Sequence, residues 1–351
     1  MGDAGLGRVL VTGGSGFVGR NLILELLAQG HQVRSLDLTR NPDADSRIEV
    51  AIGDICDPRV VAEVVDGIDT VFHTAAVICL LGGRAATSQY REHSFAVNVE
   101  ATQSLVSHAR DAGVSRLVYT SSNTVVMGDE PIVGGNESLP YTTRFADLYT
   151  ETKVVAERLV LQHNGSGGLL TCAVRPSGIW GPGDQTMFRK LLEAVASGQV
   201  RALIGSRKTV MDYTYIGNLV HAEILAANQL GPNGRASGQA YFITDGEPVN
   251  VFEFARPVVE ACGQHWPRLR VPGGLVRAVM TWWQWLHFRL GVTAPPLEPQ
   301  IVTRLCVDNY YSIDKARRDL GYEPMFTREQ GLASSLLYYT DMFKTMKHQA
   351  G

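Results

Sequence analysis

The stretch Val11-Thr12-Gly13-Gly14-Ser15-Gly16-Phe17-Val18-Gly19 decides the fold of this 351-residue chain. It follows a short apolar run at residues 8–11 and opens a segment with helical periodicity at residues 19–29. Its spaced glycines allow a tight turn, a close approach of the backbone to a pyrophosphate, and close packing of helix on strand. The helix N-terminus then presents free N–H groups to the phosphates. We therefore predict that a dinucleotide is bound by Gly13, Gly16, Phe17, Val18 and Gly19.

Short apolar strands alternate with helical patterns through the first 180 residues. Strands are predicted at residues 8–11, 31–36, 48–51, 70–73, 116–120 and 170–175, and helices at 19–29, 58–65, 95–112 and 148–162. Residues 80–90 are predicted to form a loop near the nucleotide. This alternation is typical of the α/β class, and it predicts a doubly wound parallel sheet of the Rossmann type with helices on both faces.

The pattern loosens after residue 181. Helices are predicted at 187–197 and 218–230, an extended piece at 211–216 and a strand at 240–244, before helices and Pro/Gly-rich loops dominate. Strands that return among new material indicate two domains interleaved in sequence. We predict a dinucleotide-binding domain from residues 1–180 plus about 212–246, and a smaller α-rich substrate lobe from about 181–211 plus 247–345.

Composition excludes several classes of protein. The net charge of −3 implies no large basic surface for nucleic acid. Five scattered cysteines without CxxC spacing indicate a reducing compartment, with neither a disulfide framework nor a metal site. The start MGDAGLGR does not resemble a signal peptide, and no run of 18 apolar residues predicts a membrane-spanning helix. We therefore expect a cytoplasmic protein, with peripheral membrane contact as an open alternative.

Two acidic positions bear on the choice of dinucleotide. Asp37 ends the second strand, where a carboxylate accepts hydrogen bonds from the adenosine ribose hydroxyls and repels a 2′-phosphate. This favours NAD over NADP, although the nearby Arg40 partly offsets the preference. Asp54 follows the third strand and is predicted to accept from the adenine amino group, with Ile55 packing against the ring. A turn role for Asp54 is almost equally compatible with the sequence.

The pair Tyr149 and Lys153 lies in the predicted helix 148–162, and its i,i+4 spacing places both side chains on one face. The phenol of a tyrosine normally has a pKa of about 10. The charge of Lys153, together with an oxidised nicotinamide ring, favours the phenolate, which can remove an alcohol proton as hydride leaves the carbon. Ser122, after the fifth strand, is predicted to orient the reacting oxygen, and the neighbouring Ser121 is the alternative.

Several segments in the N-terminal half resemble the extended short-chain dehydrogenase/reductase superfamily. They are Thr12-Gly13-x-x-Gly16-x-x-Gly19, Gly53-Asp54-Ile55, His73-Thr74-Ala75-Ala76, Tyr119-Thr120-Ser121-Ser122, Tyr149-x-x-x-Lys153 and residues 175–184, RPSGIWGPGD. The resemblance implies that Thr74, Ala75 and Ala76 line the cofactor and that Pro176 and Ser177 approach the nicotinamide. It also implies a homodimer through helices 95–112 and 148–162.

The second half narrows this resemblance. Residues 215–222, 238–245 and 311–322 look like the 3β-hydroxysteroid dehydrogenase/Δ5-Δ4 isomerase family, and residues 117–128 and 147–185 look close to its bacterial cholesterol dehydrogenase branch. The resemblance implies NAD-dependent oxidation of the 3β-hydroxyl of a cholesterol-like 3β-hydroxy-5-ene steroid, followed by Δ5-to-Δ4 isomerisation. Tyr241 and Asp245 match positions proposed for isomerisation in that family. Gly246 stands where a second carboxylate is expected, so a structural role for both is the alternative.

An aromatic segment at residues 276–290 carries Trp282, Trp283 and Trp285. It is too short and too charged to span a bilayer. As a helix it fits an interfacial membrane contact, an apolar lid over a pocket, or plain packing against the main domain. Other functions stay open at this point: oxidation of another apolar alcohol, chemistry on a sugar nucleotide, or a non-enzymatic dinucleotide sensor. The last is disfavoured because both Tyr149 and Lys153 are present.

Overall fold

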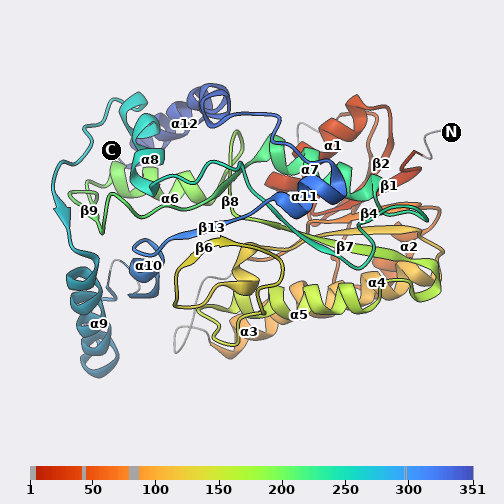
Figure 1. Ribbon diagram of the computed structural model, residues 1–351, viewed down its shortest axis with the longest axis horizontal. Coiled ribbons are helices and arrows are strands. Elements are labelled where there is room, and N and C mark those ends of the chain that lie inside the picture. Colours follow the sequence, from red (N-terminus) through yellow and green to blue (C-terminus); the bar gives the residue numbers. More distant parts are fainter. Residues whose placement is uncertain (1–4, 42–44, 79–86, 296, 298, 351) are drawn as a thin grey trace.

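The computed structural model describes residues 5–41, 45–78, 87–295, 297 and 299–350 (Figure 1). Within these ranges, one parallel sheet of seven strands in the order β11-β7-β5-β4-β1-β2-β3 forms the centre of the molecule. Its strands are β1 Arg8–Thr12, β2 Gln32–Asp37, β3 Glu49–Ile52, β4 Thr70–His73, β5 Arg116–Thr120, β7 Leu170–Pro176 and β11 Ala240–Ile243. The predicted doubly wound α/β class is confirmed.

Helices cover both faces of the sheet because successive strand residues point to opposite sides. One face carries α1 Phe17–Ala28, α7 Ile216–Asn228 and α11 Asp314–Leu320, and the other carries α2 Pro58–Val65, α4 Ala101–Asp111 and α5 Leu148–Gln162 (Figure 1). In β1, Val9 and Val11 enter the core under the first set, and Leu10 enters the core under the second. Both cores are buried, which fits a sheet whose strands are apolar on both sides.

The helix before β5 differs from its prediction. It begins with α3 Ser88–Phe95, passes through a π-helical turn at Ala96–Glu100 and continues as α4. Residues 88–90, predicted as loop, are therefore helical, while 79–86 lie outside the described residues. Thr87 caps α3 by accepting from the Tyr90 N–H, and Arg91 pairs with Glu151 of α5. The prediction missed α3 because its polar residues show no apolar period.

A smaller lobe packs beside the carboxyl ends of the strands. Helices α6 Met187–Ala196, α8 Val251–Ala261 and α12 Arg328–Ala350 meet around buried aromatic rings (Figure 1). These rings include Trp180, Phe188, Phe254 and Tyr339, with ring centroids 4.6–5.4 Å apart. Short strand pairs link the segments: β8 Gly178–Trp180 with β10 Tyr213–Tyr215, β9 Leu203–Ile204 with β12 Arg270–Val271, and β6 Ile132–Gly135 with β13 Asn309–Tyr311.

Helix α9 Gly273–Leu290 extends away from the rest of the lobe, followed by α10 Pro299–Arg304 (Figure 1). None of the α9 residues is buried. Short 3-10 turns occur at Asn123–Val126 and Ser166–Gly168. Among the helices of the described ranges, none has the length and apolar character needed to cross a bilayer.

Candidate active site

The glycine loop is held tightly between β1, β2 and β4. The Gly13 N–H donates to the Leu36 carbonyl at 2.8 Å, and the Gly16 N–H donates to the Gly13 carbonyl at 3.0 Å. Gly13 adopts φ +71°, and a Cβ there would lie 2.8 Å from the Cα of Ala75. A Cβ at Gly19 would collide with the Gly13 carbonyl oxygen. The bare backbone at the start of α1 is therefore the cradle that a pyrophosphate requires.

Asp37 lies at the end of β2, next to this loop. Its Oδ2 accepts the Ser15 N–H at 3.0 Å, and the Ser15 hydroxyl donates to the Thr39 carbonyl at 2.7 Å. The carboxylate thus fastens the glycine loop through one oxygen. The other oxygen, Oδ1, does not take part in that bond, so a ribose hydroxyl can be received at the position where the sequence predicts it.

The segment after β4 is fixed by two polar groups. The Thr74 hydroxyl donates to the Thr12 carbonyl at 2.7 Å. Asn98, in the π-helical turn, accepts the Val77 N–H at 2.8 Å and donates to the Val77 carbonyl at 2.9 Å and to Thr152 at 3.0 Å. Asn98 therefore connects the predicted cofactor-lining residues to helix α5. Sequence reasoning did not single out Asn98, whose only signal is a buried amide in an otherwise apolar turn of helix.

The predicted adenine contacts have local structural uses. Asp54 is exposed, and its Oδ1 accepts the Cys56 N–H at 2.9 Å, closing a turn. Ile55 is 8% exposed and belongs to the core under α2. The structure therefore supports the turn role of Asp54, and it leaves little of the Ile55 side chain to face an adenine ring.

The pair Tyr149 and Lys153 lies in the first two turns of α5, at the carboxyl end of β5. The Nζ atom of Lys153 is 5.8 Å from the centre of the Tyr149 ring and 4.6 Å from that of Tyr119. It donates to the Thr120 carbonyl at 2.7 Å. The Ser122 hydroxyl accepts from the Thr124 hydroxyl at 3.0 Å, and it lowers the pKa of the Tyr149 phenol. Ser121 instead donates to Glu157. Of the two serines, Ser122 is therefore the one whose hydroxyl acts on the phenol.

Burial dominates the titration of this pair. Loss of solvent raises the pKa of Tyr149 to about 12, against the opposing effect of the Ser122 hydroxyl. Loss of solvent also lowers the pKa of Lys153 to about 7, although the carboxylates of Glu157 and Glu223 favour its charge. Burial therefore opposes the phenolate that Lys153 and an oxidised nicotinamide ring are together predicted to favour. Desolvation opposes both charged forms at once.

Two buried glutamates lie beneath the pair, one on each face of the sheet. Glu157, one turn after Lys153, is paired with Arg175 at 2.6 Å and also accepts from Tyr141 at 2.7 Å. Glu223, from α7, accepts from the Thr120 hydroxyl at 2.5 Å. Burial raises the pKa of Glu223 to about 7, an effect opposed by Thr120 and Lys153. Sequence reasoning missed both carboxylates, which occupy helical positions otherwise read as apolar.

Pro176 and Ser177 follow β7, the strand next to β5. The Ser177 hydroxyl donates to the Asp212 carbonyl at 2.7 Å and accepts from the Asn123 side chain at 3.1 Å. Asn123 directly follows Ser122. The structure therefore places the two predicted nicotinamide-side residues next to the segment that carries Ser122.

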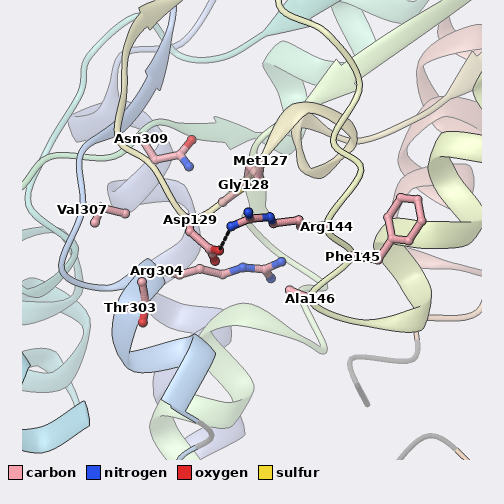
Figure 2. A pocket seen from close by; sticks show the side chains of 10 residues that line it. All are labelled: Met127, Gly128, Asp129, Arg144, Phe145, Ala146, Thr303, Arg304, Val307 and Asn309. Carbon is pink, nitrogen blue, oxygen red and sulfur yellow. Dashed lines mark hydrogen bonds and ion pairs between the residues drawn. The ribbon is translucent and has the colours of Figure 1, made fainter. Parts of the chain in front are cut away.

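A cavity of about 200 Å³ lies between the start of α5 and the C-terminal lobe (Figure 2). Its lining residues are Met127, Gly128, Asp129, Arg144, Phe145, Ala146, Thr303, Arg304, Val307 and Asn309. Arg144 pairs with Asp129 at 3.5 Å, and Arg304 pairs with Asp147, the cap of α5, at 3.2 Å. The cavity is thus positioned beside the helix that carries Tyr149 and Lys153, and its lining contains paired charges.

A family model for the 3-beta hydroxysteroid dehydrogenase/isomerase family matches residues 10–272. This range includes the glycine loop, Asp37, Ser122 and the Tyr149–Lys153 pair. The chain belongs to this family. It is 60% identical to a 3 beta-hydroxysteroid dehydrogenase/Delta 5-->4-isomerase of Mycobacterium tuberculosis, over 100% of this chain and 96% of that protein. It is 59% identical to a 3-beta-hydroxysteroid dehydrogenase of Mycolicibacterium neoaurum, over 98% and 94% of the two chains.

The fold is also found among solved structures. MoeE5, solved in complex with UDP-glucuronic acid and NAD, is 26% identical and superposes with a TM-score of 0.70, covering 95% of this chain and 98% of that one. The likeness extends over both lobes. The family resemblance inferred from the sequence is therefore confirmed by relatives that span nearly the full chain.

Tyr241 and Asp245, which match the positions proposed for isomerisation in the family, are hydrogen-bonded to other parts of the protein. The Tyr241 hydroxyl donates to the Arg235 carbonyl at 3.0 Å, and its side chain is fully buried. Asp245 accepts from Trp180 at 3.0 Å, from the Tyr215 N–H at 2.8 Å and from Asn218 at 2.8 Å. These contacts favour the structural interpretation of both residues.

Proposed function

We propose that this chain oxidises the 3β-hydroxyl of a cholesterol-like 3β-hydroxy-5-ene steroid to the 3-ketone, with NAD as oxidant, and then shifts the double bond from Δ5 to Δ4. The single observation that carries the proposal is the Tyr149–Lys153–Ser122 group beside the glycine loop. It occurs in a chain that is 60% identical to a 3 beta-hydroxysteroid dehydrogenase/Delta 5-->4-isomerase over 100% of this chain.

NAD, when bound, accepts the hydride from C3. The cradle at Gly13, Gly16 and Gly19 would hold its pyrophosphate, and Asp37 would receive the adenosine ribose. The remaining chemistry belongs to the side chains. Tyr149 accepts the hydroxyl proton, Ser122 donates to the reacting oxygen, and Lys153 offsets negative charge on the phenol. A bound, oxidised nicotinamide would supply the further lowering of the phenol pKa that Lys153 alone does not provide.

The double-bond shift needs a base but no redox step. Once C3 is a ketone, the C4 proton is acidic; a base removes it, and a proton returns at C6 through a dienolate. Because Tyr241 and Asp245 are held by structural hydrogen bonds, we assign the base to neither of them.

We propose the cavity beside α5 as the place where the steroid enters, because it opens between the catalytic helix and the C-terminal lobe. This agrees with a division into a cofactor domain of residues 1–180 plus about 212–246 and a substrate lobe of about 181–211 plus 247–345. In this division β11 returns to the main sheet after the lobe has begun.

We propose that α9 makes peripheral contact with a membrane. Trp282 and Trp285 are 64% and 54% exposed, which does not fit aromatic packing against the main domain. Trp283 instead donates to the Thr293 carbonyl at 2.9 Å. Exposed aromatic side chains together with the basic Arg289 are typical of helices that lie in the headgroup region of a lipid bilayer. An apolar substrate would be taken up from the membrane at this helix. A homodimer through residues 95–112 and 148–162 is proposed from the family resemblance.

The deciding assay mixes purified protein with NAD and a 3β-hydroxy-5-ene sterol. NADH is followed by its near-ultraviolet absorbance and the conjugated enone at shorter wavelength. We expect both signals, with NADH formed first. Absence of NADH with sterols, combined with turnover of a UDP-sugar, would replace the proposal by sugar-nucleotide chemistry. NADH without the enone would remove the isomerase step.

A further inference from the structure

An ion pair joins the C-terminal lobe to the start of the catalytic helix. Nη1 of Arg304, in α10, lies 3.2 Å from Oδ2 of Asp147, the residue that caps α5 (Figure 2 shows Arg304 reaching toward Ala146). The other oxygen of Asp147 accepts the Thr150 N–H at 2.8 Å. Only 5% of the Asp147 side chain and 27% of the Arg304 side chain are exposed, so solvent screens this pair less than a surface pair.

The Asp147 carboxylate stands two residues before Tyr149 and acts on its phenol. Burial is the larger cause of the raised pKa of Tyr149, and the charge of Asp147 raises it further, while the Ser122 hydroxyl lowers it. A cation held against Asp147 therefore weakens a negative charge that raises the pKa of the phenol, whereas the buried Glu157 is already paired with Arg175.

The other charged groups around this phenol leave that role to Arg304. Lys153 lies one turn along α5 and is bonded to the Thr120 carbonyl. Tyr119 of β5 is uncharged, because burial raises its pKa well above the usual value. From α3, Arg91 approaches the same turn of α5 but is held by both oxygens of Glu151 at 2.7 Å.

Building on the proposed function, we infer that Arg304 is a positioning residue for the proton transfer. By pairing with Asp147 it offsets the carboxylate that would otherwise hold the proton on Tyr149. Arg304 and Ala146 also line the same cavity. The same contact therefore joins the substrate lobe to the residue that caps the helix carrying Tyr149.

The test is the pH dependence of kcat/KM for sterol oxidation by the full chain with saturating NAD. Oxidation needs the phenolate, so its rate rises with pH as Tyr149 ionises. Arg304→Gln leaves Asp147 unpaired and should move the rising limb of the pH profile to higher pH by about half to one unit. At pH values below this limb, kcat/KM should therefore fall about three- to tenfold. Asp147→Asn keeps an oxygen for the Thr150 N–H and should move the limb to lower pH.

The double variant separates this role from simple folding. The double variant Asp147→Asn/Arg304→Gln carries neither charge, so its limb should lie between those of the two single variants, close to that of wild type. Arg91→Gln is the matched control: it breaks an ion pair to the same turn of α5 and should leave the limb where it is. A limb of Arg304→Gln that coincides with wild type, or a double variant whose limb stays at that of Arg304→Gln, overturns the inference.

A second readout is independent of catalysis. In protein labelled with ¹³C at the tyrosine Cζ atoms, the Tyr149 signal is identified by its loss in Tyr149→Phe. Its titration should lie at higher pH in Arg304→Gln than in wild type, at lower pH in Asp147→Asn, and between these two in the double variant. If no sterol is oxidised, the proposed function fails while this titration still decides the role of Arg304: an unchanged titration in Arg304→Gln rejects it.

Discussion

Helices α5 and α9 carry the two most distinctive segments of this chain, and they are built in opposite ways. Eight of the 15 residues of α5 are buried, including Lys153 and Glu157, and both of these polar groups have defined partners. None of the 18 residues of α9 is buried, and its aromatic side chains Trp282, Trp285 and Phe288 are exposed. A buried charge is tolerated only where the protein supplies its partners, whereas an exposed apolar face requires a partner outside the chain.

The contrast predicts that substitutions in α5 reduce catalytic activity more than substitutions in α9. Tyr149→Phe removes the proton acceptor and nothing that packs, so kcat should fall by about 10² to 10⁴-fold. Thermal unfolding should stay near that of the wild type, and NAD binding by fluorescence titration should be little changed. Trp282→Ser in α9 is the control and should keep kcat with a steroid presented in detergent. Turnover close to wild type in Tyr149→Phe would remove this residue from the mechanism.

Breaking a buried ion pair of α5 should likewise reduce the free energy of unfolding more than breaking an exposed one. Glu157→Gln keeps the shape of the side chain but leaves the buried Arg175 without its counter-charge, at a cost of about 3–5 kcal/mol in the free energy of unfolding. The matched change is Glu260→Gln, which breaks the exposed pair with Arg256 on α8 and should cost less than about 0.5 kcal/mol. Urea unfolding of both variants measures the difference. Equal costs would show that burial does not separate the two pairs.

Glycines in the two regions should also respond differently. A methyl group at Gly19 meets the Gly13 carbonyl, whereas Gly274 in α9 has nothing within 4 Å of an added Cβ. Gly19→Ala should therefore lose about 1–3 kcal/mol of stability and weaken NAD binding. Gly274→Ala should gain up to about 1 kcal/mol. Chemical denaturation and NAD titration test the pair, and a neutral Gly19→Ala would contradict the tight cradle.

The smallest effect on stability is expected in α9 itself. Replacing both Trp282 and Trp285 with Ser should change the free energy of unfolding by less than about 0.5 kcal/mol, because neither ring is buried. The same double variant should lose binding to anionic phospholipid vesicles in a sedimentation assay, whereas Leu337→Ser, an exposed apolar position on α12, should not. Retention of vesicle binding by the double variant would speak against α9 as the membrane contact.

Local sequence was sufficient wherever an element carries its own signals. The predicted bounds of α2, β4, β5 and α5 are those observed, because Asp57 and Asp147 cap the two helices and the strands are short apolar runs. It was insufficient for α3, whose polar residues are held by a contact with Glu151, 60 positions away from Arg91.

The sequence by itself determined the order of the glycine loop, the acidic end of β2 and the Tyr149–Lys153 spacing, because each depends on a few neighbouring residues. Tertiary structure alone decided which of two adjacent serines acts on the phenol, since Ser121 is drawn to Glu157. It also decided which distant groups complete the site. Glu223 reaches Thr120 across 103 positions and Arg304 reaches Asp147 across 157. Contacts over such separations leave no periodic trace in the chain and exist only once the sheet and the lobe have packed.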